Sequence, residues 1–324
     1  MGYSMITLRK RIGSLGYSIA NLALGAEGTS GRPIFVTGNG RSGTSWIGQG
    51  LGRAENLLYY REPCHPKRNG LPSGPSNEVW CRYLHPGERD SFFEYTLGAA
   101  FRGHFWRGSG HSYSAYRDRI GHQPQVLVKE VASFLSLEWV VARWQPQVLV
   151  ILRHPGAYAA SVRALNQDPE EVTRLRLLCR APALREDHLG SLLPSLERID
   201  TPLAAAVASW GIRTRVALRA LERHPDWGVV HYEDVARDPE TVFRALYARF
   251  GLPWTAEIAD WIRAKASSES KGLFSTSRVS QTRIDAWRGQ LTRAEAMNVR
   301  QVLEPFELPL YGAEADWDGP YRDE

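Results

Sequence analysis

The chain has 324 residues, 43% of them hydrophobic and 23% charged, which suits one large α/β domain or two modest ones with a well-buried core. Its net charge of +5 comes mainly from arginine, with no basic run interleaved with aromatic residues. This pattern suits a polyanionic ligand and argues against nucleic acid as a partner. Three cysteines without a CxxC spacing argue against a disulfide framework and a zinc site, and they favour the reducing cytoplasm.

Residues 1–31 are expected to form an N-terminal leader outside the domain. The basic stretch Arg9–Arg11 precedes a weakly apolar segment, 12–26, which serine, glycine, tyrosine and asparagine interrupt. This segment is too broken for a signal peptide, and no stretch reaches the roughly 18 apolar residues of a membrane-spanning helix. We expect a flexible leader, with a basic amphipathic segment that touches a membrane or a partner as the alternative.

Strand and helix patterns alternate along the rest of the chain. Apolar runs predict strands over 34–38, 57–60, 126–130, 148–152 and 228–232. Helical stretches are expected over 43–53, 133–143, 155–165 and 239–250. Strands separated by helices predict an α/β fold, with a parallel β-sheet flanked by helices on both faces.

A single domain is expected over residues 32–312, because no linker divides this part of the chain. Two long segments interrupt the alternation: 61–125 is rich in Gly, Pro, Arg and aromatic residues, and 166–200 is polar and punctuated by proline. Long excursions of this kind usually form lids or pocket walls. Both are therefore interpreted as insertions on the acceptor side, and residues 313–324 as a C-terminal tail.

The most informative segment is residues 34–46, IFVTGNGRSGTSW, which reads as a strand, a glycine-rich turn and the start of a helix. Backbone N–H groups of such a turn converge on an anion, and the hydroxyls of Ser42, Thr44 and Ser45 add donors. Gly38–Ser45 fits the nucleotide-binding pattern G-x-x-x-x-G-K-[ST], except that Thr44 replaces the lysine. The loop therefore predicts a phosphate-like ligand other than a nucleoside triphosphate.

A second anion site is predicted around residues 147–163. The strand there ends at Arg153, and Pro155 suits the first turn of a helix. Arg153 thus lies at the carboxyl end of a strand, where open α/β sheets bind ligands. Ser161 follows about two helical turns later, near the same side as the helix start. A guanidinium and a hydroxyl so placed are suited to hold a second phosphate group.

Two phosphate sites without the Walker lysine resemble those of the sulfotransferases that use 3′-phosphoadenosine 5′-phosphosulfate (PAPS), in particular the carbohydrate and general sulfotransferase branch. Roughly residues 32–312 carry this resemblance, which implies a P-loop-like sheet. It rests on four segments in the family's order: Arg41–Gly48 for R-S-G-[ST]-[ST], Tyr60–Pro66 for the E-P-x-x-H-type segment, Val230–Asp234 with Asp238–Pro239 for Y-E-D-L…D-P, and Ser277–Arg278 with Asp285–Leu291 for S-R…W-R-x-x-L. The loop alone is a moderately specific indicator of this family, whereas four matching segments in the family's order are a strong one.

The resemblance also implies which residues bind the donor. The first loop would hold the 5′-phosphosulfate, and an Arg…Ser pair would hold the 3′-phosphate. The donor-binding residues expected on this basis are Gly40, Arg41, Ser42, Gly43, Thr44, Ser45, Trp46, Arg153, Ser161, Tyr232, Arg278 and Arg283. Trp46 and Tyr232 are expected to flank the adenine, although core packing is the alternative for Trp46. Arg278 and Arg283 are expected to close over the 3′-phosphate, with ordinary surface arginines as the alternative.

Sulfuryl transfer needs a base for the acceptor, a cation over the moving group and support for the departing phosphate. In the carbohydrate branch the glutamate that matches Glu62 is the expected base. Arg41 is the candidate for stabilising the moving group, where many relatives carry lysine. The alternatives are a solvated ion pair of Glu62 with Arg61 or Arg53, and a loop-bracing role for Arg41.

Two further residues are candidates for catalysis. Lys129 matches the lysine of cytosolic relatives, but Val131 stands at the position of their histidine base, which strengthens the case for a glutamate base. Lys129 is expected either to aid the sulfuryl group or to pair with Glu130. His65 is included as an assistant to the base or a contact of the acceptor, with a structural role as the alternative.

The predicted function is therefore transfer of a sulfuryl group from PAPS to a hydroxyl or amine of a carbohydrate, lipid or secondary-metabolite acceptor, without a metal ion. One alternative is a P-loop-type small-molecule kinase. It would need the Walker lysine and a strand-end aspartate for magnesium, where Thr44 and Lys129 stand. The other is a nucleotide-binding relative that has lost catalysis.

Overall fold

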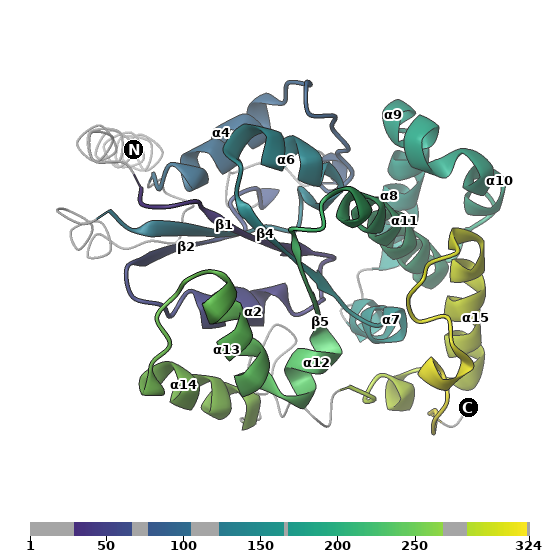
Figure 1. The fold of residues 1–324 in the computed structure, drawn as a ribbon. Coiled ribbons are helices and arrows are strands. Elements are labelled where there is room, and N and C mark those ends of the chain that lie inside the picture. The colour runs from purple at the N-terminus through teal and green to yellow at the C-terminus, as the bar shows by residue number, and fades with distance from the viewer. Residues whose placement is uncertain (1–28, 67–76, 105–122, 165–167, 268–283, 323–324) are drawn as a thin grey trace, which may run out of the picture.

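The computed structural model describes residues 29–66, 77–104, 123–164, 168–267 and 284–322. Its centre is a five-stranded sheet with the order β2-β3-β1-β4-β5, in which every neighbouring pair is parallel (Figure 1). The strands are β1 (Ile34–Gly38), β2 (Leu57–Arg61), β3 (Gln125–Lys129), β4 (Gln147–Leu152) and β5 (Gly228–His231). The predicted strands are confirmed, with ends that differ by at most one residue.

The helices that alternate with the strands are also confirmed, with somewhat different ends. The principal helices are α2 (Thr44–Leu51), α4 (Ser91–Phe101), α6 (Leu137–Trp144), α7 (Pro155–Ala164), α8 (Asp168–Arg180), α11 (Pro202–Arg223), α12 (Tyr232–Arg237), α13 (Pro239–Arg249), α14 (Ala256–Ser267) and α15 (Arg293–Leu303). The helix expected over 133–143 begins as a 3₁₀ turn, Phe134–Ser136, before α6. Among the described residues, no helix combines the length and apolarity needed to span a bilayer.

Both faces of the sheet are buried because successive side chains of a strand point to opposite sides. Phe35 of β1 packs with α4 and α6 in one apolar cluster, whereas Ile34 and Val36 pack with α2, α13 and α14 in another. Figure 1 shows α4 and α6 above the sheet and α2, α13 and α14 below it. This arrangement explains the continuous apolar strands that the sequence displays.

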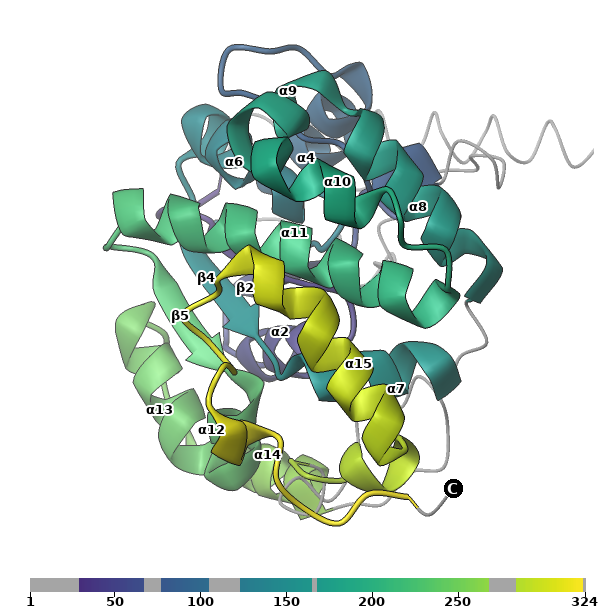
Figure 2. The ribbon, with the colours of Figure 1, turned by 90° about the vertical axis from the view of Figure 1, so that its right-hand side faces the viewer.

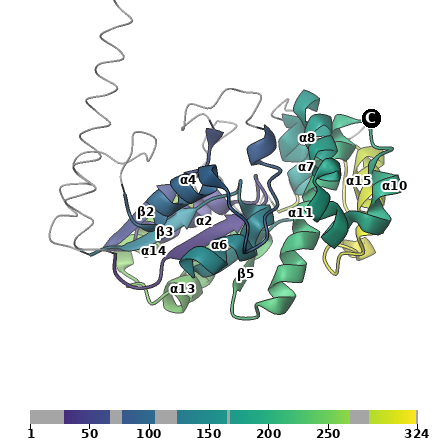
Figure 3. The same cartoon turned by 90° about the horizontal axis from the view of Figure 1, so that it is seen from above.

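A further group of helices lies at the carboxyl end of the sheet. Helix α8 packs along α11, and α15 lies against α11 and α7 (Figures 2 and 3). Leu175 and Leu178 of α8 share an apolar cluster with Ile212 of α11. The described part of the predicted insertion 166–200 is therefore largely helical, because its leucines recur at helical spacing and form a core of their own. Its assignment to the acceptor side stays a prediction, as do the boundaries of the domain.

Candidate active site

The carboxyl ends of all five strands meet at one edge of the sheet, and this edge carries most of the predicted site residues. Glu62 follows β2, Lys129 ends β3, the loop 39–43 follows β1, Arg153 follows β4, and Tyr232 follows β5. The strand order places Glu62 and Lys129 together at one end of this edge. It places the loop, Arg153 and Tyr232 along the remainder.

The loop after β1 is shaped for close approach to an anion. Gly43 has a left-handed φ of 86°, and a Cβ on it would lie 2.3 Å from Cδ2 of Tyr232. Only glycine therefore allows this ring to cover the loop. Helix α2 begins at Thr44 without a side-chain cap. The Ser42 hydroxyl is buried and has no hydrogen-bond partner among the described residues, so uncommitted donors gather at this helix start.

The predicted 3′-phosphate pair contacts the same loop. Nη1 of Arg153 donates to the backbone carbonyl of Arg41 at 2.7 Å. Nε of Arg41 donates to the Ser161 hydroxyl at 2.8 Å. The Arg153 guanidinium lies 4.4 Å from the centre of the Tyr232 ring, a cation–π distance. Four residues that were predicted to bind PAPS therefore lie in one cluster at the ends of β1, β4 and β5: Arg41, Arg153, Ser161 and Tyr232. The Arg41 guanidinium lies beside Ser161, and its role at the moving group stays a prediction.

Trp46 and Tyr232 differ in their surroundings. Trp46 is buried and packs edge-on against Tyr232 and Phe243, with ring centres 6.3 and 5.8 Å apart. This is the core packing that the sequence left open for Trp46. Tyr232 is only partly buried, and its place beside Arg153 keeps it a candidate for contact with the adenine.

Glu62 and Lys129 form an ion pair at the ends of β2 and β3. The Lys129 side chain is 2% exposed and that of Glu62 is 16% exposed, so Glu62 is the member that solvent or an acceptor can reach. Burial lowers the pKa of the Lys129 ammonium, and the Glu62 carboxylate opposes that shift. Gly48 of α2 leaves room for the lysine, because a Cβ there would lie 3.2 Å from Lys129 Cγ.

This pair differs from the ion pairs that the sequence suggested, which were Glu62 with Arg61 or Arg53 and Lys129 with Glu130. Lys129 contacts Glu62 through its ammonium, whereas the Glu130 carboxylate accepts backbone N–H groups. Arg53 pairs with Glu257 of α14 at 3.0 Å. Pairing between β2 and β3 aligns Arg61 with Lys129, and this register brings the next residue, Glu62, to the lysine.

The remaining predicted residues lie around these two centres. His65 donates its backbone N–H to the Glu62 carbonyl at 3.1 Å, and its ring meets that of Trp80 edge-on at 6.0 Å. Thr44 is buried at the start of α2. Arg278 and Arg283 lie outside the described residues, so their expected contact with the 3′-phosphate stays a prediction.

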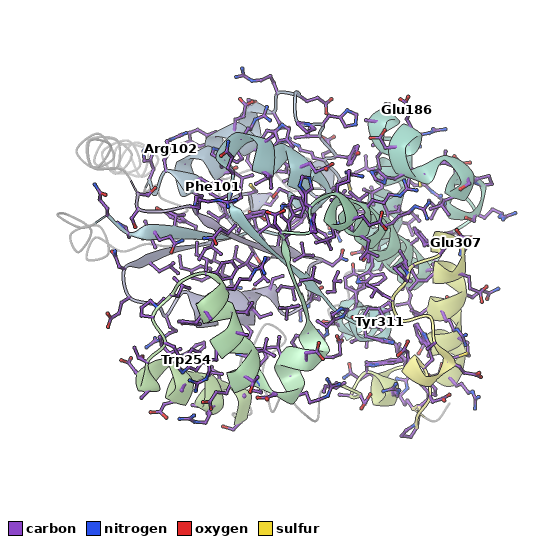
Figure 4. All side chains as sticks on the ribbon, in the orientation of Figure 1. Phe101, Arg102, Glu186, Trp254, Glu307 and Tyr311 are labelled. Carbon is purple, nitrogen blue, oxygen red and sulfur yellow. The ribbon has the colours of Figure 1, made fainter. Side chains whose placement is uncertain are left out.

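A group of residues that were not predicted from the sequence lies beside Arg153 and supports this part of the site. Glu233 accepts the backbone N–H of His154 at 2.9 Å and the hydroxyl of Tyr311 (Figure 4) at 3.3 Å. The His154 ring stacks on Trp287 at 4.7 Å, and burial lowers its pKa to about 3. His154 is therefore neutral at physiological pH. The C-terminal segment is thus packed onto the residue that follows Arg153.

The sequence offered one signal for this group, the acidic residue within Tyr232-Glu233-Asp234. It gave no sign that Glu233 reaches two segments distant in the chain. Glu130 was named only as a possible partner of Lys129. A glutamate inside the mainly apolar run 126–135 is itself a signal, because a buried carboxylate requires hydrogen-bond donors.

The family of this chain follows from these features together with its sequence relatives. Residues 33–256 match the family model described as "Sulfotransferase family", and the chain belongs to that family. It is a sulfotransferase, and this family takes the sulfuryl group from PAPS. Membership disfavours the kinase alternative.

Its relatives include carbohydrate sulfotransferase 5 of Mus musculus, which is 27% identical over 311 residues that cover 83% of this chain and 78% of that protein. Carbohydrate sulfotransferase 3 of Mus musculus is 36% identical over 168 residues, 51% of this chain and 33% of that protein, so this match spans about a third of the relative's length.

Similar solved structures include two sulfotransferases. Mouse sulfotransferase SULT7A1 complexed with PAP has a TM-score of 0.44 and 13% identity, covering 90% of this chain and 91% of that one. Sulfotransferase STF9 from Mycobacterium avium has a TM-score of 0.47 and 17% identity, covering 93% of this chain and 83% of that one.

Proposed function

We propose that this enzyme transfers the sulfuryl group of PAPS to a hydroxyl of a carbohydrate, with Glu62 as the general base. The acceptor class is supported by relatives named carbohydrate sulfotransferases. Lipid, amine and secondary-metabolite acceptors are the competing classes. The observation that carries the base assignment is the Glu62–Lys129 pair, in which the carboxylate is the exposed member.

The donor is proposed to bind along the β1, β4 and β5 part of the sheet edge. The loop 39–45 and the first N–H groups of α2 would hold the 5′-phosphosulfate, and Arg153 and Ser161 the 3′-phosphate. Two buried polar atoms without a partner among the described residues support this fit: the Ser42 hydroxyl oxygen and Nε of Arg153. A buried donor of this kind is costly unless a ligand accepts its hydrogen bond.

The chemistry proposed is an in-line displacement at sulfur. The acceptor oxygen forms the new S–O bond while Glu62 takes its proton, and the bond between sulfur and the 5′-phosphate oxygen breaks. The electron pair of that bond stays on the departing phosphate. Arg41 and the N–H groups of the loop stabilise the negative charge there. Lys129 favours the carboxylate form of Glu62 before the transfer, because an ammonium beside a carboxylate stabilises its charge.

Several expectations stay predictions. His65 follows Glu62 closely and is proposed to contact the acceptor. Tyr232 is proposed to flank the adenine, and Arg278 and Arg283 to close over the 3′-phosphate. The proposed mechanism uses no metal ion. The cytoplasmic location inferred from the cysteines is retained as a proposal.

The test is sulfation by the Glu62→Gln variant, with labelled PAPS as donor and a panel of glycans, lipids and phenols as acceptors. We expect kcat to fall about 10²- to 10⁴-fold, the usual contribution of a general base. Affinity for 3′-phosphoadenosine 5′-phosphate (PAP), measured by calorimetry, is expected to stay unchanged, because Glu62 lies at the opposite end of the edge.

The matched control is Glu257→Gln, which removes a surface carboxylate paired with Arg53. It is expected to behave as the wild type. Full turnover by Glu62→Gln would overturn the base assignment. Sulfation of lipids or phenols with no sulfation of any glycan would overturn the proposed acceptor class.

A further inference from the structure

Glu130, the residue after β3, is completely buried directly beside the Glu62–Lys129 pair. Its carboxylate accepts three backbone N–H groups. Oε1 accepts those of Val131 and Ala132, both at 2.8 Å, and Oε2 accepts that of Cys64 at 2.6 Å. The first two belong to its own turn, whereas Cys64 belongs to the segment that follows β2. The carboxylate therefore joins the exits of two neighbouring strands.

Cys64 is two residues beyond Glu62, whose backbone has an unusual conformation. The φ of Glu62 is +52°, in the left-handed region that few residues other than glycine adopt. The Glu62 N–H donates to the Lys129 carbonyl at 2.6 Å, and the His65 N–H donates to the Glu62 carbonyl at 3.1 Å. A strained conformation of this kind persists only where the surrounding structure fixes it. The hydrogen bond from the Cys64 N–H to Glu130 holds the far side of this turn against the end of β3.

We propose that Glu130 is a positioning residue for sulfuryl transfer, whose buried carboxylate holds the turn after β2 so that Glu62 faces Lys129 and the acceptor. This inference rests on the proposed role of Glu62 as the base. Glu130 itself cannot be that base, because it is inaccessible to an acceptor.

A carboxylate suits this position better than an amide. All three of its partners donate hydrogen bonds, and an ionised carboxylate only accepts them. Glutamine would present its NH₂ group to the donors on one side, either at Cys64 or at Val131 and Ala132. That side of the bridge would be lost.

The charge of Glu130 also bears on the base. Burial raises the pKa of the Glu130 carboxyl, and the Glu62 carboxylate raises it further, whereas the N–H donors and Lys129 lower it. The influence is mutual, so a Glu130 carboxylate makes Glu62 a stronger base. Among the described residues, Cys64, Arg61 and Arg82 are further titratable or charged groups that face this cluster.

A purely structural role is the competing explanation, since Cys64 is also anchored to α4 by its Sγ, which lies 3.1 Å from the Thr96 hydroxyl. The experiment therefore compares Glu130→Gln with Val140→Ala. Val140 of α6 is fully buried in the apolar cluster that also contains Cys64. Its truncation therefore loosens the core without removing a carboxylate. The measurements are thermal stability, PAP affinity, and the pH profile of kcat/KM.

For Glu130→Gln we expect kcat to fall roughly 10- to 100-fold, the effect of a small misplacement of a catalytic group, with PAP affinity unchanged. We also expect the acid limb of kcat/KM to move to lower pH, because loss of the neighbouring negative charge makes Glu62 a weaker base. Val140→Ala is expected to lose stability while keeping kcat within about twofold of the wild type and the acid limb in place.

Glu130→Asp carries the test if the glutamine variant does not fold. It keeps the buried charge but is one methylene too short for both sides of the bridge, so kcat is expected to fall while the acid limb stays in place. If the Glu130 variants keep kcat and the acid limb of kcat/KM as Val140→Ala does, the positioning role is overturned. The assignment of Glu62 as the base would then still stand. Full turnover by Glu62→Gln would overturn the base assignment, and this inference with it.

Discussion

Replacement of Gly43 by alanine tests the geometry of the donor loop most directly. The left-handed backbone of Gly43 costs alanine about 1–2 kcal/mol. The new methyl would lie 2.3 Å from the Tyr232 ring, and forcing a methyl into a packed contact costs about 1–3 kcal/mol. We therefore expect Gly43→Ala to lower the free energy of unfolding by about 2–5 kcal/mol. The lower end of this range applies if the Tyr232 ring moves aside.

Movement of the ring would also weaken donor binding. Tyr232 would leave the Arg153 guanidinium, now 4.4 Å from its centre, and lose a cation–π contact of about 0.5–2 kcal/mol. If Arg153 binds the 3′-phosphate, PAP affinity is expected to fall about 2- to 30-fold. Urea unfolding of the protein without PAP measures the first effect, and calorimetric titration with PAP the second.

Gly40→Ala in the same loop is the matched control for stability, since a Cβ there meets nothing within 4 Å. It is expected to unfold at the wild-type urea concentration. Wild-type stability of Gly43→Ala would refute the packing of Tyr232 against the loop. Lower stability with unchanged PAP affinity would refute the link from Tyr232 to the donor site.

Two further predictions concern contacts outside the donor loop. Glu233→Gln weakens the support of the His154 backbone, so we expect about 1 kcal/mol lower stability in urea unfolding and weaker PAP binding, whereas Glu240→Gln on α13 should leave PAP binding unchanged. The hydrogen bond to Asp187 raises the pKa of His85. The contribution of His85 to stability is therefore fully present below about pH 6.5 and is lost as pH rises through the higher folded-state pKa. Because His85 is half exposed, urea unfolding of His85→Gln should show a deficit of a few tenths of a kcal/mol, present near pH 5.5 and absent near pH 9; a deficit independent of pH would contradict this assignment.

The strands were predictable because burial on both faces leaves a local record, a short run of β-branched and aliphatic residues. The convergence of Arg153 and the loop 39–43 was predictable for a related reason. Parallel strands end at one edge, so residues that follow strands lie near one another. Neither inference needed the order of the strands.

The pairing of Glu62 with Lys129 did need that order. It arises because β2 lies beside β3 with Arg61 opposite Lys129, a relation set by tertiary packing rather than by either segment alone. For the same reason, the sequence alone left two roles open for Lys129 and could not name the partner of Glu62. The contact between Arg41 and Ser161 likewise depends on the left-handed φ of Arg41, 67°, which no local pattern around a non-glycine residue announces.

Strand order also explains why one sheet edge can serve two chemical tasks. Lys129 is opposite Val36 of β1 on one side and Arg61 of β2 on the other. The loop that would hold the phosphosulfate therefore begins next to the strand that ends at Lys129. An acceptor at Glu62 would approach from the β2 side, and the departing phosphate would remain on the β1 side. An in-line displacement requires this separation of entering and leaving oxygens, with the sulfur between them. Lys129 and the buried Glu130 lie at the end of β3, between these two sides. A substitution at the end of β3 would therefore alter the alignment of the acceptor with the sulfur without altering the affinity for the donor.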